Sequence, residues 1–157
     1  MANGQLSHEL EVNVPASEAW DLFGTLRVVK LIEEQFSSLI QKIDLVEGDG
    51  GVGTVLHLKF VPGTPGLTGY KEKFTKIDNE ARIKEAEVIE GGYLDLGFSH
   101  YLVRFEIIEK ATDSCIIKAT IEYQVKEEAA ANASLVSIEP LANILLLAQN
   151  HLTKPKA

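Results

Sequence analysis

The sequence predicts an α+β protein, in which a curved antiparallel sheet of about seven strands packs against a long C-terminal helix. Apolar and polar residues alternate along most of the chain, as in half-buried strands, and Gly, Pro or Asp/Asn clusters separate these segments. The last segment instead has apolar residues at three- and four-residue steps, which is a helical period. With 157 residues, the chain is expected to form one domain over 1–157.

The N-terminal region is predicted to contain one strand and two short helices. Alternation over 6–14 predicts the strand, which ends at Pro15. Ser17 is a favourable N-cap for a first helix, broken near Gly24. Thr25 could cap a second helix, in which apolar residues recur at helical spacing.

Six further strands and the long helix complete the predicted fold. Tight turns between successive strands require antiparallel pairing. The helix predicted over about 128–153 is expected to bend at Pro140, and it is the only element large enough to cover the apolar face of the sheet. The predicted strands cover residues 39–46, 53–60, 70–77, 82–89, 93–108 and 114–125.

Charge and composition exclude several classes of partner. The net charge of −8 disfavours nucleic acid and anionic membranes, and no apolar run is long enough to span a bilayer. No signal peptide is predicted, and Cys115 is the only cysteine, so a cytoplasmic protein without a disulfide is expected. The four histidines lack metal-ligand spacing, so no metal is expected. A monomer or a weak homodimer is expected.

The segment 48–53 reads G-x-G-x-x-G, the pattern of a dinucleotide-binding loop. That interpretation requires a helix after the last glycine. Residues 54–60 instead alternate and are rich in strand-forming side chains. The glycines are therefore predicted to form a tight hairpin rather than a nucleotide site.

Two charged residues fall on the apolar faces of neighbouring predicted strands. Tyr70, Glu72 and Phe74 share one face, because the lysines between them mark the opposite face as solvated. Lys84 points inward by the same argument, since Glu85 and its neighbour Glu87 lie on the other side of their strand. The apolar face of the predicted 93–108 strand includes Tyr101, Val103 and Phe105.

Two interpretations of the inward charges remain open at this stage. Burying a charge costs several kcal/mol unless it is paired, so Glu72 and Lys84 could simply neutralise each other. Alternatively, they line a water-accessible cavity between sheet and helix. A desolvated lysine near a carboxylate can exchange protons near neutral pH, as carbonyl and amine chemistry requires.

Several motifs resemble the pathogenesis-related class-10 and birch-pollen-allergen proteins of plants. "GDGGVGT", "YKEKF", "IDNEARIKEA" and "IEGGYLDLG" are similar to the norcoclaurine synthase branch. "LSHELEV", "GFSHYLVRFEI" and "AANAS" are more similar to the monocot norbelladine synthases. The resemblance covers nearly the whole chain. It implies the helix-grip fold, in which a seven-stranded antiparallel sheet wraps around the C-terminal helix and encloses a hydrophobic cavity.

The resemblance also implies an activity without a cofactor. Members condense a phenethylamine, such as dopamine or tyramine, with an aromatic aldehyde through an iminium, and their catalytic residues match Tyr70, Glu72 and Lys84. Lys84 would protonate the aldehyde oxygen, Glu72 would act as general base, and Tyr70 would orient a phenol or shape the cavity mouth. The resemblance and the strand faces together predict these cavity-lining residues: Leu58, Leu67, Phe74, Tyr101, Val103 and Ile138.

One position departs from the norcoclaurine synthases. They have an aspartate where this chain has Val103, whereas norbelladine synthase-like sequences have an aliphatic residue there. The resemblance therefore implies imine formation and leaves ring closure open. The alternative is a carrier that binds a phytohormone or another amphipathic metabolite without converting it.

Overall fold

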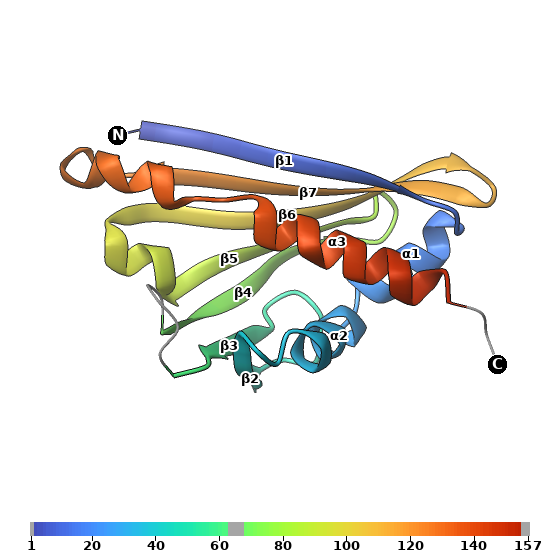
Figure 1. The fold of residues 1–157 in the computed structure, drawn as a ribbon, viewed down its shortest axis with the longest axis horizontal. Coiled ribbons are helices and arrows are strands. Elements are labelled where there is room, and N and C mark those ends of the chain that lie inside the picture. Colours follow the sequence, from blue (N-terminus) through green and yellow to red (C-terminus); the bar gives the residue numbers. More distant parts are fainter. Residues whose placement is uncertain (1, 63–67, 155–157) are drawn as a thin grey trace.

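A computed structural model describes residues 2–62 and 68–154, and it contains the predicted seven-stranded sheet (Figure 1). The strand order is β1-β7-β6-β5-β4-β3-β2, and every neighbouring pair is antiparallel. Consecutive strands pair through hairpins from β2 to β7, as the short turns require. The strands are β1 (Ala2–Val12), β2 (Ile40–Glu47), β3 (Val55–Phe60), β4 (Gly69–Asp78), β5 (Ile83–Gly91), β6 (Phe98–Ala111) and β7 (Ser114–Val125).

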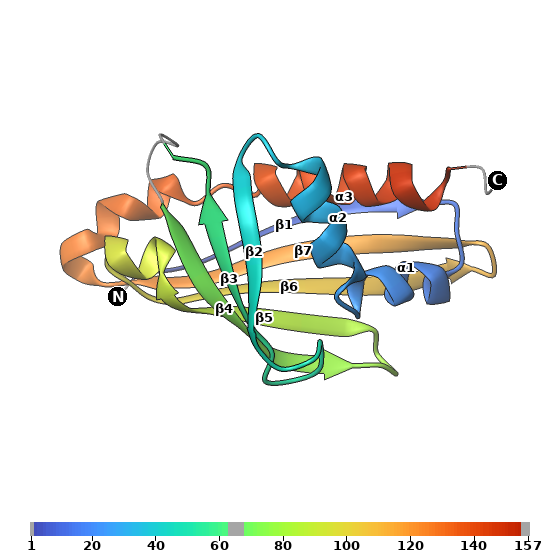
Figure 2. The same ribbon diagram turned by 90° about the horizontal axis from the view of Figure 1, so that it is seen from below.

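Helices cover one face of the sheet. Figures 1 and 2 show α3 (Glu139–Leu152) lying along β1 and β7, while α1 (Ala16–Phe23) and α2 (Arg27–Gln35) lie near one end. Figure 2 also shows that β2 and β3 run across the direction of β1 and β7, so the sheet is strongly curved. This curvature, together with α2 and α3, leaves the inner face of β3 to β6 available to form a cavity wall.

The main hydrophobic core lies where α1 and α3 meet β7. Ile117 and Ala119 of β7 are fully buried, as are Phe23 of α1 and Leu145 of α3. The alternation of residues along β7 explains this arrangement, because every second side chain points to the same side of a strand. The predicted inner face of the strand is thereby confirmed from Cys115 to Ile121.

The C-terminal segment differs from the predicted bent helix. A 3₁₀ segment, η2 (Glu127–Leu135), is followed by the extended residue Val136, and α3 begins only at Glu139. Pro140 therefore lies in the first turn of a helix, where its missing N–H is not needed. By length and composition the stretch 127–152 is apolar enough to cross a membrane, but the extended residue interrupts it.

Two further local predictions are corrected by the structure. Ser17 lies inside α1, whose N-cap position is Pro15, and no side chain caps this helix. The strand predicted from residue 93 starts at Phe98, because residues 92–96 form a 3₁₀ turn, η1 (Gly92–Leu96). Gly97 ends this turn with φ of 92°, a left-handed conformation that glycine adopts without strain.

The glycine-rich segment is a hairpin between β2 and β3, as predicted. Gly50 has φ of 109°, and its N–H donates to Oγ1 of Thr54 at 2.9 Å. The same hydroxyl donates to the carbonyl of Gly51 at 2.7 Å, which closes the loop on itself. No helix follows the last glycine, since β3 begins at Val55, so the loop lacks the helix N-terminus of a dinucleotide site.

Candidate active site

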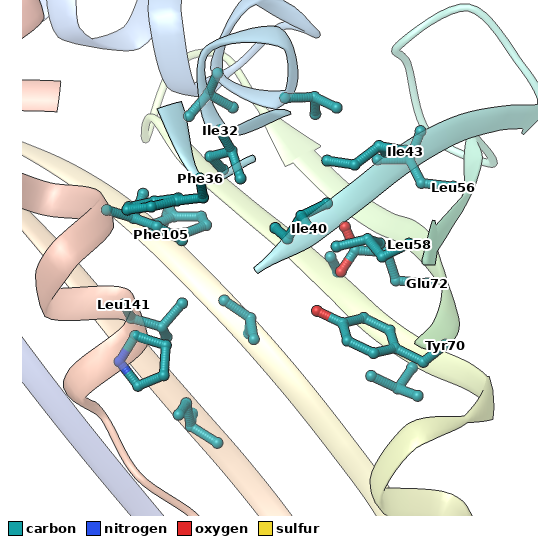
Figure 3. A pocket seen from close by; sticks show the side chains of 18 of the residues that line it. Ile32, Phe36, Ile40, Ile43, Leu56, Leu58, Tyr70, Glu72, Phe105 and Leu141 are labelled. Carbon is teal, nitrogen blue, oxygen red and sulfur yellow. The ribbon is translucent and has the colours of Figure 1, made fainter. Parts of the chain in front are cut away.

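A cavity of about 510 Å³ lies between the curved sheet and the helices α2 and α3 (Figure 3). This volume falls within the range of about 300–1,000 Å³ that is typical of small-molecule sites. Most of its wall is aliphatic or aromatic. The lining residues are Val28, Val29, Ile32, Phe36, Leu39, Ile40, Ile43, Leu56, Leu58, Phe60, Tyr70, Glu72, Phe74, Lys84, Ala86, Val88, Tyr93, Tyr101, Val103, Phe105, Ile121, Ser137, Glu139, Pro140, Leu141, Asn143 and Ile144.

Strand alternation positions the polar groups of this cavity. Tyr70, Glu72 and Phe74 project from β4 into the same space, and Lys84 projects from β5. Figure 3 shows the carboxylate of Glu72 and the hydroxyl of Tyr70 directed into the cavity. The inward orientation predicted for these four residues is therefore confirmed.

Glu72 and Lys84 do not neutralise each other as an ion pair. Across the β4–β5 hairpin Glu72 lies opposite Val88, whereas Lys84 lies opposite Ile77, so the two side chains start several positions apart. A register shift between Phe74 and Lys76, which lies between these two pairs, adds to the offset. Among the ion pairs of the described residues, none within 4.0 Å joins these two groups. Their charges still attract each other at longer range, and each affects the pKa of the other.

The ammonium of Lys84 is held by weak partners. Its side chain is buried, with 4% of the residue surface exposed. Nζ donates a hydrogen bond to the carbonyl of Thr25 at 3.3 Å and lies 4.0 Å from the centroid of the Phe74 ring. Thr25 belongs to the connection between α1 and α2, so this short connection reaches the cavity face of the sheet. A cation–π contact and one carbonyl replace only part of the lost hydration.

Burial shifts the pKa values of both charged groups toward neutrality. It lowers the pKa of Lys84 to about 8, although the carboxylate of Glu72 partly opposes this shift. It raises the pKa of Glu72 to about 7, and the Lys84 charge partly opposes that shift. Both groups can therefore accept and release protons close to neutral pH, as general acid–base catalysis requires.

Three tyrosines also line the cavity. Tyr93 of η1 stacks on Tyr101 of β6, with ring centroids 4.4 Å apart and planes 8° from parallel. Burial raises the pKa of Tyr70, Tyr93 and Tyr101 above the ordinary phenol value, so all three stay protonated at neutral pH. Neutral phenols can donate to and accept from the hydroxyls of a bound aromatic ring.

The predicted lining set is largely found, with one correction. Leu58, Phe74, Tyr101 and Val103 line the cavity, whereas Leu67 lies outside the described residues. Ile138 is not among the lining residues. It precedes α3 and packs against a hydrophobic cluster that includes the cavity-lining residues Tyr101 and Ile121.

Sequence reasoning missed the contributions of the helices and of η1. Leu141 and Ile144 of α3 line the cavity together, because residues three apart lie on the same face of a helix. Ile32 of α2 and Phe36 just after it close another side. The helical spacing of Leu141 and Ile144, and of Ile32 and Phe36, could have indicated that these residues share a buried face. No such pattern indicates Tyr93, because its segment is predicted to be a strand.

No metal-binding cluster accompanies the cavity. Within residues 2–62 and 68–154, no three His, Cys, Asp or Glu side chains lie close enough together to hold a metal ion. The polar groups that the described strands and η1 place in the cavity wall are the Lys84 ammonium, the Glu72 carboxylate and three phenols, and Ser137, Glu139 and Asn143 line it near α3.

Comparison with known proteins identifies relatives along almost the whole chain. Norbelladine synthase from Narcissus pseudonarcissus is 49% identical over 154 residues, which cover 98% of this chain and 94% of that protein. S-norcoclaurine synthase 2 from Papaver somniferum is 39% identical over 154 residues, covering 97% of this chain but only 66% of the relative.

Solved structures of norcoclaurine synthase are also similar to this chain over almost its whole length. Truncated norcoclaurine synthase from Thalictrum flavum superposes with a TM-score of 0.89 at 36% identity, covering 99% of this chain and 96% of that one. The same enzyme in complex with dopamine and hydroxybenzaldehyde gives a TM-score of 0.88 at 36% identity, with 99% and 90% covered. The sequence profile of the pathogenesis-related protein Bet v 1 family matches residues 1–152. This chain belongs to the pathogenesis-related protein Bet v 1 family.

Proposed function

We propose that this chain is an enzyme that condenses a phenethylamine with an aromatic aldehyde, with loss of water, to form an iminium. The observation that carries the proposal is a buried ammonium and a carboxylate that share one apolar cavity without forming an ion pair. Such an arrangement costs stability, so a role in proton transfer explains it better than structure does. Relatives with the names norbelladine synthase and norcoclaurine synthase support the same reaction.

The reaction needs several proton transfers, and Glu72 and Lys84 are the candidate groups for them. Glu72, as carboxylate, takes a proton from the substrate ammonium, so that the neutral amine can attack the aldehyde carbon. Lys84, as ammonium, donates a proton to the carbonyl oxygen during the attack, and its neutral amine then takes a proton from the substrate nitrogen, which leaves a neutral carbinolamine. The restored ammonium donates this proton to the carbinolamine hydroxyl as water leaves, and Glu72 finally returns its own proton to Lys84. The nitrogen lone pair then forms the C=N bond. Glu72 and Lys84 thus act as base and acid.

The rest of the cavity binds and shields the two rings. Its aliphatic and aromatic walls bury the rings, and its volume suits a small bimolecular complex. Tyr70 and the stacked pair Tyr93–Tyr101 supply hydroxyls for phenolic substituents. Excluding water from this space also protects the iminium from hydrolysis.

The first experiment compares product formation with and without the protein. Tyramine or dopamine is mixed with 4-hydroxybenzaldehyde or 4-hydroxyphenylacetaldehyde, and products are separated by chiral chromatography after reduction of any imine. Because Val103 adds no acid to the wall, we expect accelerated imine formation and little enantiomerically enriched ring-closed product. Tight binding of a ligand together with the uncatalysed rate for every pair would contradict the proposal and favour a carrier.

The pH dependence of kcat/KM, which reports the ionisation of the ligand-free protein, is expected to be bell-shaped with a narrow maximum between about pH 7 and pH 8. Activity rises as Glu72 loses its proton near its pKa of about 7, and falls as Lys84 loses its proton near its pKa of about 8. Because the two groups interact, the apparent pKa values of the two limbs describe the pair and not either residue alone. Initial rates at substrate concentrations well below KM, from pH 5 to pH 10, measure the profile. A flat profile over this range would argue against proton transfer by this pair.

A further inference from the structure

The amine of Lys84 has the surroundings of a carbonyl-reactive lysine. Nζ lines an apolar cavity, and its one hydrogen-bond acceptor among the described residues is the Thr25 carbonyl. The Phe74 ring covers one side at 4.0 Å. No carboxylate of the described residues forms an ion pair with it. A lysine desolvated in an apolar pocket is the usual setting of Schiff-base chemistry.

We propose that Lys84 itself forms a Schiff base with an aromatic aldehyde bound in the cavity when no substrate amine is present. This role differs from proton donation by the ammonium, because it uses the neutral amine as a nucleophile. It rests on the proposed function only for the choice of an aromatic aldehyde. The covalent step needs no amine substrate.

Atoms and protons balance with the groups present. The lone pair of Nζ forms a C–N bond to the aldehyde carbon, and the carbonyl oxygen takes a proton from the protonated fraction of Glu72. The Glu72 carboxylate then accepts a proton from nitrogen, giving a neutral carbinolamine. The same carboxyl returns this proton to the hydroxyl as the C–O bond breaks, which leaves a protonated imine on Nζ, the carboxylate of Glu72 and one water.

The ionisation of the facing groups supports this role. A pKa of about 8 makes the neutral fraction of Lys84 at pH 7.5 on the order of a hundredfold larger than that of an exposed lysine. The charged group that acts on it is Glu72 of β4, while Tyr70 and Tyr101 stay neutral and Glu139 of α3 is exposed. The protonated fraction of Glu72 at this pH supplies the acid.

The Schiff base also predicts how an added amine acts on it. A neutral phenethylamine can attack the imine carbon, and the bond to Nζ breaks as Lys84 leaves. The product imine is the same as in direct condensation. Added amine should therefore discharge the adduct rather than leave it intact.

The test uses the full chain with 4-hydroxybenzaldehyde and sodium borohydride at pH 7.5, with no amine. Borohydride reduces an imine to a stable amine, and peptide mass mapping locates the hydroxybenzyl group. We expect labelling at Lys84 at least about tenfold above that at any exposed lysine, in line with its larger neutral fraction. Tyramine added before the reductant should lower the label on Lys84.

Two variants serve as matched controls. Lys84→Arg keeps a positive charge but cannot form the imine, so it should lose the selective label, while Lys73→Arg on the exposed face of β4 should keep it. Glu72→Gln should slow labelling by about 10- to 100-fold, because the proton shuttle is removed. The wild-type map decides the question even if Lys84→Arg fails to fold.

The outcomes separate this inference from the proposed function. A label distributed over exposed lysines and absent from Lys84, in a protein that turns over amine and aldehyde, overturns the Schiff base and leaves the condensation intact. Selective labelling of Lys84 in a protein that makes no condensation product supports the Schiff base and contradicts the proposed function.

Discussion

Replacing Lys84 with methionine is expected to abolish turnover and at the same time to stabilise the fold. Loss of the general acid should lower kcat by about 10²- to 10⁴-fold. The stability gain follows from the pKa, which falls from 10.5 to about 8 on folding, because burial penalises the ammonium. A pKa shift corresponds to about 1.4 kcal/mol per unit, but the loss of the Lys84 charge also removes the attraction that favours the Glu72 carboxylate. We therefore expect the free energy of unfolding at pH 7 to rise by about 2 kcal/mol, which corresponds to about 4–8 °C in Tm.

The sign of this effect depends on pH in a testable way. A depressed lysine pKa destabilises the fold most below pH 8, where lysine is charged in both folded and unfolded states. This penalty disappears above about pH 10.5, where Lys84 is neutral in both the folded and the unfolded state. The gain in Tm of Lys84→Met should therefore shrink from pH 7 to pH 10. Thermal unfolding by circular dichroism measures it.

A surface lysine provides the control for the methionine substitution. Lys73→Met alters an exposed position on β4 and should change neither kcat nor the pH dependence of Tm. If Lys84→Met instead lowered Tm at pH 7, the ammonium would be a structural group. The proposed catalytic role would then lose its main physical argument.

Glu72→Gln is the second substitution with a large expected effect. The amide has nearly the same shape but cannot accept a proton, so kcat should fall by about 10²- to 10⁴-fold. The acidic limb of the pH profile should disappear, because it reports the ionisation of Glu72. The pKa of Lys84 should fall further, since the carboxylate that favours its ammonium is lost. Steady-state kinetics from pH 5 to pH 10 test both expectations.

The stability effect of Glu72→Gln has the opposite pH dependence. The pKa of Glu72 rises from 4.5 to about 7 on folding, so the buried carboxylate destabilises the fold above pH 7 and costs nothing below pH 4.5. The variant should gain more Tm, relative to wild type, at pH 8 than at pH 5. Glu80→Gln, in the exposed turn after β4, is the matched control and should show no such difference. An equal change in Tm at pH 5 and pH 8 would mean that folding does not penalise the ionised form of Glu72.

Much of the cavity wall could be predicted from the sequence, because strand alternation is a local property. The side chains of residues two apart point the same way whatever the rest of the chain does. The inward orientation of Tyr70, Glu72, Phe74 and Lys84 follows from this rule alone. The hairpin at the glycine-rich loop could be predicted for a similar reason, since the residues just after Gly53 determine whether a strand or a helix follows.

Other features required knowledge of how distant segments meet. Alternation says nothing about whether residues 92–96 continue a strand, so η1 and the stacking of Tyr93 on Tyr101 went unrecognised. The helical period did not reveal that η2 and α3 are separate elements. The family resemblance predicts Ile138 in the cavity wall, whereas the side of α3 that carries Leu141 lines it.

The sequence by itself determined that an ammonium and a carboxylate face the interior, because a period of two is encoded in neighbouring residues. Only the tertiary structure decided whether these charges pair. Their separation depends on the register of β4 against β5, including the register shift between Phe74 and Lys76, and on the reach of the α1–α2 connection to Nζ of Lys84. The distance between two charges on different strands is a property of long-range packing, and in this protein that packing leaves both groups able to titrate near neutral pH.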